Sequence, residues 1–275
     1  MIAVKKKDGG IRPVGISEVI RRVIAKTIAW TIRDDIKQVT GSRQCAGLQG
    51  ACEASVKAMD ELYQEGNAIL VLDAEGAYNN LNRYGALKVA AREIPDAYQA
   101  LRNFYEHPIR AIYNGTEFVI EEGTIQGCPL STAIYDLGIQ PFVKEMETEA
   151  ISQIWVVDDL AAAGKPEDLK VWNDKMKKNG PKYGYEMNKK KPYILAEDDR
   201  ILKLFEEDIT KEELEQAVGA RYLGAPIGTV EFKSDFFKVK MEKINDKIRK
   251  LTRLAKTSPH ASYYIYTCLL YTSPS

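Results

Sequence analysis

The sequence lacks several features that mark common classes of protein. Its four cysteines form no CxxC pair, and only two histidines occur among the 275 residues. A zinc site or a disulfide framework is therefore not expected, and a reducing intracellular compartment, either cytoplasm or nucleus, fits this cysteine usage. No apolar run reaches the roughly 18 residues that a membrane helix needs. The first residues are basic rather than signal-like, so we expect no membrane partner.

The chain also has no net charge, because 39 basic side chains balance 39 acidic ones. The distribution is uneven, however: residues 1–43 carry ten Lys or Arg against four acids, and residues 233–256 carry nine against three. Basic ends around an acidic middle suit a protein that holds a polyanion at its edges and metal ions between them. Solvated helix faces would give the same charges, so the charge pattern leaves both explanations open.

The hydrophobic pattern predicts a mixture of helices and strands without regular alternation, which is typical of an α+β fold. The length favours two lobes over one compact body, and no internal repeat or low-complexity linker is present. Hairpins are expected at 4–14, around Asp8-Gly9-Gly10, and at 109–120, around Asn114-Gly115. The other elements expected from the pattern are helices at 17–37, 50–65, 82–105, 166–179 and 234–257, a helix starting near Pro129, strands at 68–72, 151–157, 160–163, 183–187 and 193–196, and a last hairpin from 221–227 and 230–232.

Two of the expected strands end in acidic residues. The strand at 68–72 runs directly into Asp73, and the strand at 151–157 runs into Asp158 and Asp159. Carboxylates at rigid strand ends are suitable Mg²⁺ ligands, because they leave room for waters and substrate phosphates. If the two strands are neighbours in one sheet, these carboxylates could share two metal ions and promote an in-line phosphoryl displacement.

Each acidic site also has a simpler explanation. Asp73 could cap the helix that follows it, and Asp158-Asp159 could be ordinary turn residues. Adjacent carboxylates in a tight turn repel each other unless a cation neutralises them, which favours a functional role for this pair. Two other Asp-Asp pairs serve for comparison: Asp34-Asp35 ends an amphipathic helix and is expected in solvent, whereas Asp198-Asp199 precedes a helical pattern and is expected to cap it.

Five short motifs resemble those of reverse transcriptases, particularly the enzymes of retroelements without long terminal repeats. The resemblance covers about residues 4–256, and five motifs in the same order are far more specific than any one alone. Two positions depart from the family pattern: Val156 replaces an aromatic residue, and Cys128 stands where many relatives have Asp. The motifs are Asp73-Ala-Glu-Gly-Ala-Tyr-Asn-Asn-Leu-Asn-Arg83, Gly123-Thr-Ile-Gln-Gly-Cys-Pro-Leu130, Val156-Val-Asp-Asp159, Gly184-x-x-x-Asn188-x-x-Lys191 and Tyr222-Leu-Gly224.

The resemblance implies roles for individual residues. Asp73 and Asp158 would be the principal ligands of two Mg²⁺ ions, with Mn²⁺ as a substitute, and Asp159 an auxiliary ligand. Tyr78 would close the sugar pocket against a ribose 2′-hydroxyl, with core packing as the alternative explanation for its ring. Lys191 could equally be one more surface lysine. The other implied contacts are Gln126 and Gly127 with the template and incoming base, Lys6, Lys7, Arg12 and Lys191 with the triphosphate, and Leu223 and Gly224 with the primer end.

The resemblance also implies the fingers and palm of a right-hand polymerase fold, with an antiparallel palm sheet packed on helices and most of the thumb missing. The start of the chain almost on the first hairpin leads us to expect further sequence upstream in the parent protein. The implied divisions are fingers 1–67, palm 68–105, a hairpin between fingers and palm 106–122, palm 123–233, the start of a thumb or a connecting helix 234–267, and a non-native tail 268–275 that resembles translated adapter sequence.

The implied activity is RNA-directed DNA synthesis, with an RNA template, a DNA or RNA primer and deoxynucleoside triphosphates as partners. The sequence does not predict an oligomeric state. An RNA-dependent RNA polymerase is one alternative, although such enzymes carry an acidic residue near the position of Tyr78 to accommodate the ribose hydroxyl. A catalytically inactive remnant that binds nucleic acid through its basic ends is the other.

Overall fold

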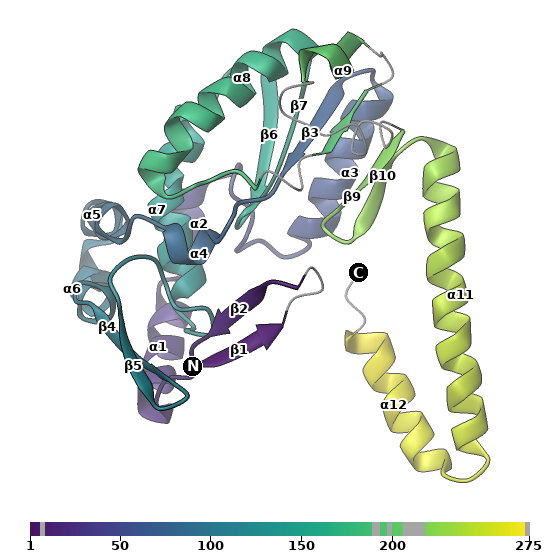
Figure 1. The fold of residues 1–275 in the computed structure, drawn as a ribbon, viewed down its shortest axis with the longest axis horizontal. Helices are drawn as coiled ribbons and strands as arrows, with labels where there is room; N and C mark the ends of the chain where they lie inside the picture. Colours follow the sequence, from purple (N-terminus) through teal and green to yellow (C-terminus); the bar gives the residue numbers. More distant parts are fainter. Residues whose placement is uncertain (6–8, 189–192, 197–199, 206–217, 273–275) are drawn as a thin grey trace.

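The computed structural model describes residues 1–5, 9–188, 193–196, 200–205 and 218–272. A four-stranded antiparallel sheet, in the order β6-β7-β3-β8, occupies the upper part of the molecule in Figure 1. Its strands are β3 (Ala68–Leu72), β6 (Ile151–Val156), β7 (Asp159–Gly164) and β8 (Tyr193–Leu195). The helices are α1 (Val19–Thr31), α2 (Arg33–Thr40), α3 (Ala51–Gln64), α4 (Ala77–Asn80), α5 (Arg83–Glu93), α6 (Pro95–Tyr105), α7 (Ser131–Glu145), α8 (Pro166–Asn179), α9 (Arg200–Leu204), α11 (Val230–Ala255) and α12 (Pro259–Thr272), with a 3₁₀ turn at Gly180–Tyr183.

Strand β3 is buried along its whole length, because helices cover both faces of the sheet. Ile69 and Val71 pack into an apolar cluster with α3 and the β9–β10 hairpin described below. Leu70 and Leu72 point to the other face and join the larger cluster formed with α7 and α8. The alternation follows from the period of two in a strand, and burial on both faces explains the unbroken apolar sequence.

Two hairpins and α1 form a second region, called here the hairpin lobe, at the lower left of Figure 1. The first hairpin pairs β1 (Ile2–Lys5) with β2 (Ile11–Val14), and the second pairs β4 (Ile109–Tyr113) with β5 (Thr116–Ile120). The second turns on Asn114 and Gly115, both with positive φ (49° and 79°), as a type I′ turn requires. The hairpins expected at 4–14 and at 109–120 are confirmed in the described residues, and Asp8, in the first turn, lies outside them.

A third pair of strands leads into the C-terminal helices. Strands β9 (Gly219–Tyr222) and β10 (Ala225–Gly228) form a hairpin that packs on α3. Helix α11 starts directly after β10 and stands apart from the four-stranded sheet, and α12 folds back beside it (Figure 1). No helix in the described part of the chain is both long and apolar enough to cross a membrane.

Four expectations about elements between residues 17 and 232 were wrong. The helix expected at 82–105 is two helices, α5 and α6, because Pro95 starts a new helix at its first position. The helix expected at 17–37 is two helices, α1 and α2, which meet at Ile32. Residues 183–187 form no strand but a single bridge from Met187 to Ala74, since Tyr183 ends the 3₁₀ turn and Gly184 has a left-handed φ of 79° rather than an extended backbone. The last hairpin ends at Gly228 rather than at 232, because Thr229 caps α11 by accepting a hydrogen bond from the Phe232 N–H.

The C-terminal helices also differ from expectation. Helix α12 was not predicted, and it continues through Thr272, into the segment expected to be a non-native tail. The origin of residues 268–275 stays a prediction, and 273–275 lie outside the described residues. The Asp198-Asp199 pair, expected to cap a helix, lies outside them as well.

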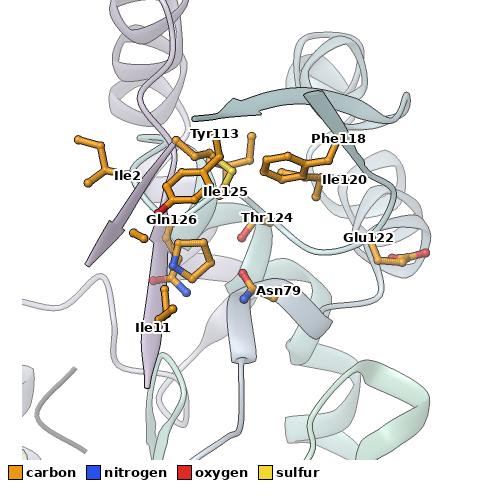
Figure 2. A pocket seen from close by; sticks show the side chains of 13 residues that line it. Ile2, Ile11, Asn79, Tyr113, Phe118, Ile120, Glu122, Thr124, Ile125 and Gln126 are labelled. Atoms are coloured by element: carbon orange, nitrogen blue, oxygen red, sulfur yellow. The ribbon is translucent and has the colours of Figure 1, made fainter. Parts of the chain in front are cut away.

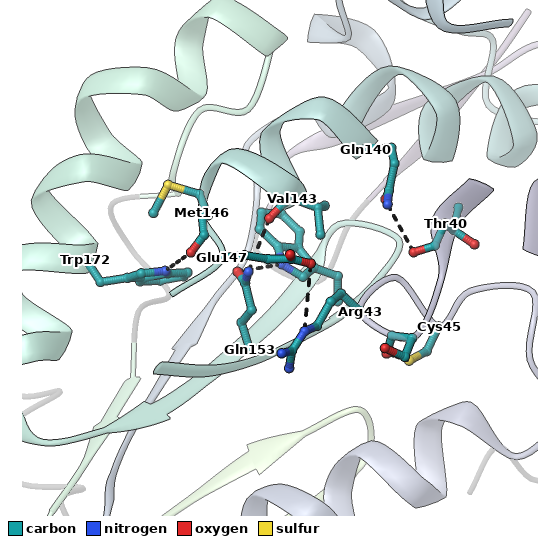
Figure 3. A network of polar contacts seen from close by, with 11 residues as sticks. Thr40, Arg43, Cys45, Gln140, Val143, Met146, Glu147, Gln153 and Trp172 are labelled. Carbon is teal, nitrogen blue, oxygen red and sulfur yellow. Dashed lines mark hydrogen bonds and ion pairs between the residues drawn. The ribbon is translucent and has the colours of Figure 1, made fainter. Parts of the chain in front are cut away.

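Buried amides connect α2, α7 and β6 (Figure 3). The Gln140 side chain on α7 donates to the Thr40 carbonyl at 3.1 Å, and Gln153 on β6 donates to the Val143 carbonyl at 3.2 Å. Gln140 and Gln153 are 4% and 1% exposed, so each bond satisfies a group that water cannot reach. The end of α2 is thereby fixed to the helix that covers the sheet.

Candidate active site

The ends of β3 and β7 bring two acidic residues together. Leu72, the last residue of β3, pairs with Leu160 in the antiparallel register. Asp73 follows Leu72 and Asp159 precedes Leu160, so the two acids leave the same end of neighbouring strands. The two strands are thus neighbours in one sheet, which is the condition under which their carboxylates could share metal ions.

Asp158 lies in the tight turn between β6 and β7. Val156 pairs with Asp159, so Val157 and Asp158 alone form the turn. Val157 has a φ of +60°, which is uncommon for a β-branched residue and is a kind of backbone strain found at functional sites. Asp158 is half-buried, whereas Asp159 is exposed.

The charges of all three carboxylates act on one buried hydroxyl, that of Tyr185. Burial raises the pKa of Tyr185 well above its ordinary value, and the charges of Asp158, Asp73 and Asp159 raise it further. The Tyr185 hydroxyl also donates to the Asp158 carbonyl oxygen at 3.5 Å. The three acids therefore lie near enough to the Tyr185 hydroxyl at this end of the sheet for their charges to act on it.

Asp73 does not cap the helix that follows it. Gly76 occupies the N-cap position of α4, and no side chain accepts a hydrogen bond there. The Asp73 carboxylate instead accepts a bond from the Asn188 side chain at 3.4 Å, and its carbonyl accepts from the Asn188 N–H at 2.9 Å. The capping explanation left open by the sequence is thereby removed.

Tyr78 lies on α4, beside α7, the helix that follows the next motif. Its hydroxyl is 3.2 Å from the Thr132 hydroxyl, and its ring centroid is 5.2 Å from that of Tyr135. Burial raises the pKa of the Tyr78 hydroxyl despite the bond to Thr132, and the charges of Asp158 and Asp136 act in the same direction. The ring is thus held by α7 close to the acidic end of the sheet.

Asp136 is a buried acid that sequence reasoning missed. It lies on α7, is 3% exposed, and its Oδ1 has no hydrogen-bond partner. Burial raises the pKa of this carboxyl well above its ordinary value, and the charge of Asp158 raises it further. The signal available in the sequence was an acid within the otherwise apolar run of residues 133–139.

The loop that carries Gln126 and Gly127 packs on the end of β2. The Gly15 N–H donates to the Gln126 carbonyl at 2.7 Å. Gly127 has a φ of +105°, and a Cβ there would lie 2.6 Å from the Gly15 carbonyl oxygen. Glycine is therefore required at position 127 both by conformation and by the close approach of β2.

Gln126 also lines a cavity of about 330 Å³ between the two hairpins. Figure 2 shows the rings of Tyr113 and Phe118 on one side and Asn79 on the other. The lining is mainly apolar. The Gln126 side chain therefore borders this cavity on the side of the hairpin lobe.

Arg83, the last residue of the first motif, has a structural role that the sequence did not reveal. Arg83 is 4% exposed, and its guanidinium donates to the carbonyls of Gly123 and Glu122 at 2.9 and 3.1 Å. A further bond reaches the His107 carbonyl at 3.3 Å. Arg83 thus secures the start of the loop that leads to Gln126.

The remaining predicted residues are placed only in part. Arg12 lies exposed on β2, opposite Val4. Leu223 and Gly224 form the turn of the β9–β10 hairpin, with φ of 46° and 88°. Lys6, Lys7 and Lys191 lie outside the described residues.

No group of three or more His, Cys, Asp and Glu side chains suited to holding a metal ion occurs among the residues that the structure describes. Mg²⁺ is usually held by one or two carboxylates together with waters and substrate phosphates, rather than by a closed protein cage. Asp73 and the Asp158-Asp159 turn supply such a donor set, so these residues fit a site of this kind.

Comparisons with known proteins agree with the motifs. A family model described as reverse transcriptase (RNA-dependent DNA polymerase) matches residues 4–227. The apo telomerase of Candida tropicalis is similar in structure with a TM-score of 0.55 at 12% identity, over 74% of this chain and 39% of that one. The same telomerase truncated from its C-terminal domain gives a TM-score of 0.50 at 13% identity, over 82% of this chain and 52% of that one. At such low identity the likeness shows the fold alone, and the chain spans about half or less of those telomerase chains.

Proposed function

The chain belongs to the reverse transcriptase family, and from this premise we propose that it is the core of an RNA-directed DNA polymerase. In this reaction a primer 3′-hydroxyl attacks the α-phosphorus of a deoxynucleoside triphosphate, and pyrophosphate leaves. The observation that carries the proposal is the meeting of Asp73, Asp158 and Asp159 at one end of the sheet, around the Tyr185 hydroxyl. Membership in the family supports a nucleic-acid polymerase, and the template and substrate are part of the proposal.

Divalent metal ions belong to the proposal. Asp73 and Asp158 would be the principal ligands and Asp159 an auxiliary one, for two Mg²⁺ or Mn²⁺ ions. When bound, such ions stabilise the charge that develops on the attacking and leaving oxygens. Asn188 would keep the Asp73 carboxylate in place through the bond at 3.4 Å.

Tyr78 is proposed to select the sugar of the incoming nucleotide. Its ring is fixed by the hydroxyl contact with Thr132 and by the contact with Tyr135, both on α7. A rigid ring next to the sugar would clash with a 2′-hydroxyl and tolerate a deoxyribose. Packing accounts for how the ring is held, and the proximity of Asp158 supports the functional role.

The other contacts follow the path of the nucleic acid. Gln126 and Gly127 are proposed to lie against the template and incoming base, because Gly127 allows close backbone approach. Arg12, with Lys6, Lys7 and Lys191, would bind the triphosphate, for which the planar guanidinium is well suited. Leu223 and Gly224 would support the primer end.

The divisions expected from the sequence remain proposals as well. The fingers would comprise residues 1–67, the palm 68–105 and 123–233, with the hairpin at 106–122 between fingers and palm, and residues 234–267 would be the start of a thumb or a connecting helix. An intracellular site of action, in the cytoplasm or nucleus, is also proposed, and the four free cysteines support it.

Primer extension on an RNA template tests the proposal. We expect Mg²⁺-dependent extension with deoxynucleotides, poor use of ribonucleotides, and a loss of about 10³-fold or more in Asp158→Asn, since the charge of a principal metal ligand is removed. The control is Asp35→Asn, which removes a carboxylate from an exposed Asp-Asp pair on α2.

Other outcomes would favour the alternatives. Efficient use of ribonucleotides would contradict the role of Tyr78 and favour an RNA polymerase. Primer–template binding without extension, equal in the wild type and Asp158→Asn, would favour an inactive nucleic-acid-binding remnant.

A further inference from the structure

The turn that carries Asp158 is held by a glutamine from outside its own sheet. Gln44 lies in the segment between α2 and α3 and is 1% exposed. Its Oε1 accepts a hydrogen bond from the Val157 N–H at 2.9 Å, and its Nε2 donates to the Val157 carbonyl at 3.1 Å. One side chain therefore binds both backbone groups of the residue that precedes Asp158.

The backbone around Gln44 fixes this side chain against β6. The Trp155 N–H donates to the Arg43 carbonyl at 2.8 Å, and the Cys45 N–H donates to the Trp155 carbonyl at 2.7 Å. Gln44 thereby forms a parallel bridge with Trp155, along the outer edge of β6 in the four-stranded sheet. A buried side chain on a hydrogen-bonded backbone has little freedom, so its amide is presented to the turn in one orientation.

Both hydrogen bonds from Gln44 bind Val157, the turn residue whose backbone conformation is disfavoured. Val157 adopts a φ of +60°, a conformation that its branched side chain disfavours. Such a conformation persists only where the surroundings stabilise it. Because a primary amide offers a donor and an acceptor together, it satisfies the N–H and the C=O of Val157 at once, which no aliphatic side chain and no ionised carboxylate can do.

We propose that Gln44 is a positioning residue for nucleotide addition, one that holds the Val157 backbone in the left-handed conformation and so sets the direction of the Asp158 carboxylate. This inference rests on the polymerase function proposed above. It also gives the segment after α2 a role in the site, because Gln140 fastens the end of α2 to α7 at Thr40. The sequence places Gln44 far from Asp158, and only the fold brings them together.

Steady-state kinetics of primer extension test the proposal. Gln44→Met keeps the length and volume of the side chain and removes both hydrogen bonds. We expect the kcat for deoxynucleotide addition to fall about 10- to 100-fold, the size of effect known for a displaced catalytic group, while the KM for the nucleotide changes little. The matched control is Gln49→Met, the same change at an exposed position of the same segment, which should leave kcat and KM unchanged.

A second substitution tests whether Gln44 acts through the backbone conformation of Val157. Glycine adopts positive φ without the penalty that valine has. We therefore expect Val157→Gly to restore part of the kcat lost in Gln44→Met. If Gln44→Met lowers kcat only by destabilising the fold, adding Val157→Gly should lower kcat further, because Val157 packs against the core.

Hydrogen exchange of the Val157 amide gives a readout that does not depend on activity. The amide should be protected in the wild type and in Gln49→Met, and should exchange much faster in Gln44→Met. If the wild type extends no primer, the polymerase function fails, and the exchange measurement still decides the role of Gln44.

Two results would overturn the proposal: a wild-type kcat in Gln44→Met, or an equally protected Val157 amide. Should Gln44→Met not fold, Gln44→Asn keeps the amide but shortens the side chain by one methylene, so that it cannot make both bonds to Val157 with the present geometry. A lowered kcat in Gln44→Asn is then expected, and a wild-type kcat would overturn the proposal.

Discussion

At the scale of single residues, the site owes its character to groups buried around the three acids. Tyr185 and Asp136 contribute a hydroxyl and a carboxyl that water hardly reaches, and the negative charge of Asp158 acts on both. Each therefore favours its neutral form in the folded protein. The stability of the fold must then depend on pH through Asp136.

We predict that Asp136→Asn stabilises the protein at neutral and higher pH. The folded-state pKa of Asp136 is raised, so the unfolded chain ionises first as the pH rises above about 4, and stability is lost between the two pKa values. An amide cannot ionise, and removing one unit of pKa difference is worth about 1.4 kcal/mol. Thermal unfolding without divalent metal should give a Tm about 2–4 °C higher for the variant at pH 8 and little difference at pH 4.

The exposed Asp35 provides the matched control for this prediction. Asp35→Asn should leave the pH dependence of the Tm unchanged. A wild-type pH dependence in Asp136→Asn would contradict the assignment of a buried, neutral carboxyl.

The sequence revealed the acids at the site but not the residues that hold them. Asp73, Asp158 and Asp159 stand at the ends of apolar runs, a local signal that is visible in the chain itself. Gln44 carries no such signal, because its role arises from contacts between distant segments. Asp136 shows in the sequence only as an acid within an apolar run, and its missing hydrogen-bond partner arises from burial in the folded chain. Long-range contacts of this kind cannot be inferred from spacing in one sequence.

At the scale of elements, polar contacts among the described residues form a joint between the start of α11 and α3. Asp60 on α3 accepts a bond from the Gly228 N–H at 3.2 Å and pairs with the Lys233 ammonium at 2.7 Å. Gln64, one turn further along α3, donates to the Gly228 carbonyl at 3.1 Å. The first turn of α11 is thereby fixed to the helix that supports β3.

We predict that Asp60→Asn lowers the affinity for nucleic acid without changing the rate of the chemical step. The Asp60–Lys233 pair is only about a quarter exposed on each side, so its loss should release α11, whose basic side chains would contact the primer–template. Fluorescence anisotropy should show a Kd for primer–template raised about 3- to 10-fold, while the rate of nucleotide addition in the bound complex stays unchanged.

The neighbouring pair on α3 supplies the control for the joint. Glu61 pairs with Lys57 at 3.7 Å, and both side chains are exposed, so Glu61→Gln should leave the Kd as it is. An unchanged Kd in Asp60→Asn would show that the joint does not position α11 for binding.

The sequence predicted elements well where the pattern is local. The 109–120 hairpin follows from Asn114-Gly115 between two apolar runs, and β3 from its unbroken apolar sequence. The division between α1 and α2 at Ile32 has no Gly or Pro to announce it, and a 3₁₀ turn with the left-handed Gly184 replaces the start of the strand expected at 183–187. The spacing of apolar residues in one sequence predicts neither feature.

At the scale of the whole molecule, the fold joins segments that are far apart in the sequence into one acidic end of a sheet. Strand β3 contributes Asp73, the β6–β7 turn contributes Asp158, and α7 supports both Tyr78 and Asp136. The hairpin lobe with Arg12 and the β9–β10 turn with Gly224 are separate elements in the described chain. This arrangement suits a reaction in which a template, a primer and a nucleotide meet at one point.

The central claim is that acids from two different strands act as one catalytic site. The most direct test is the Mg²⁺-dependent rate of a single deoxynucleotide addition by the wild type, Asp73→Asn, Asp158→Asn and the control Asp35→Asn. Our account predicts that both Asp73→Asn and Asp158→Asn lower the rate by about 10³-fold or more, while Asp35→Asn retains it. A wild-type rate in Asp73→Asn or in Asp158→Asn would contradict the shared site.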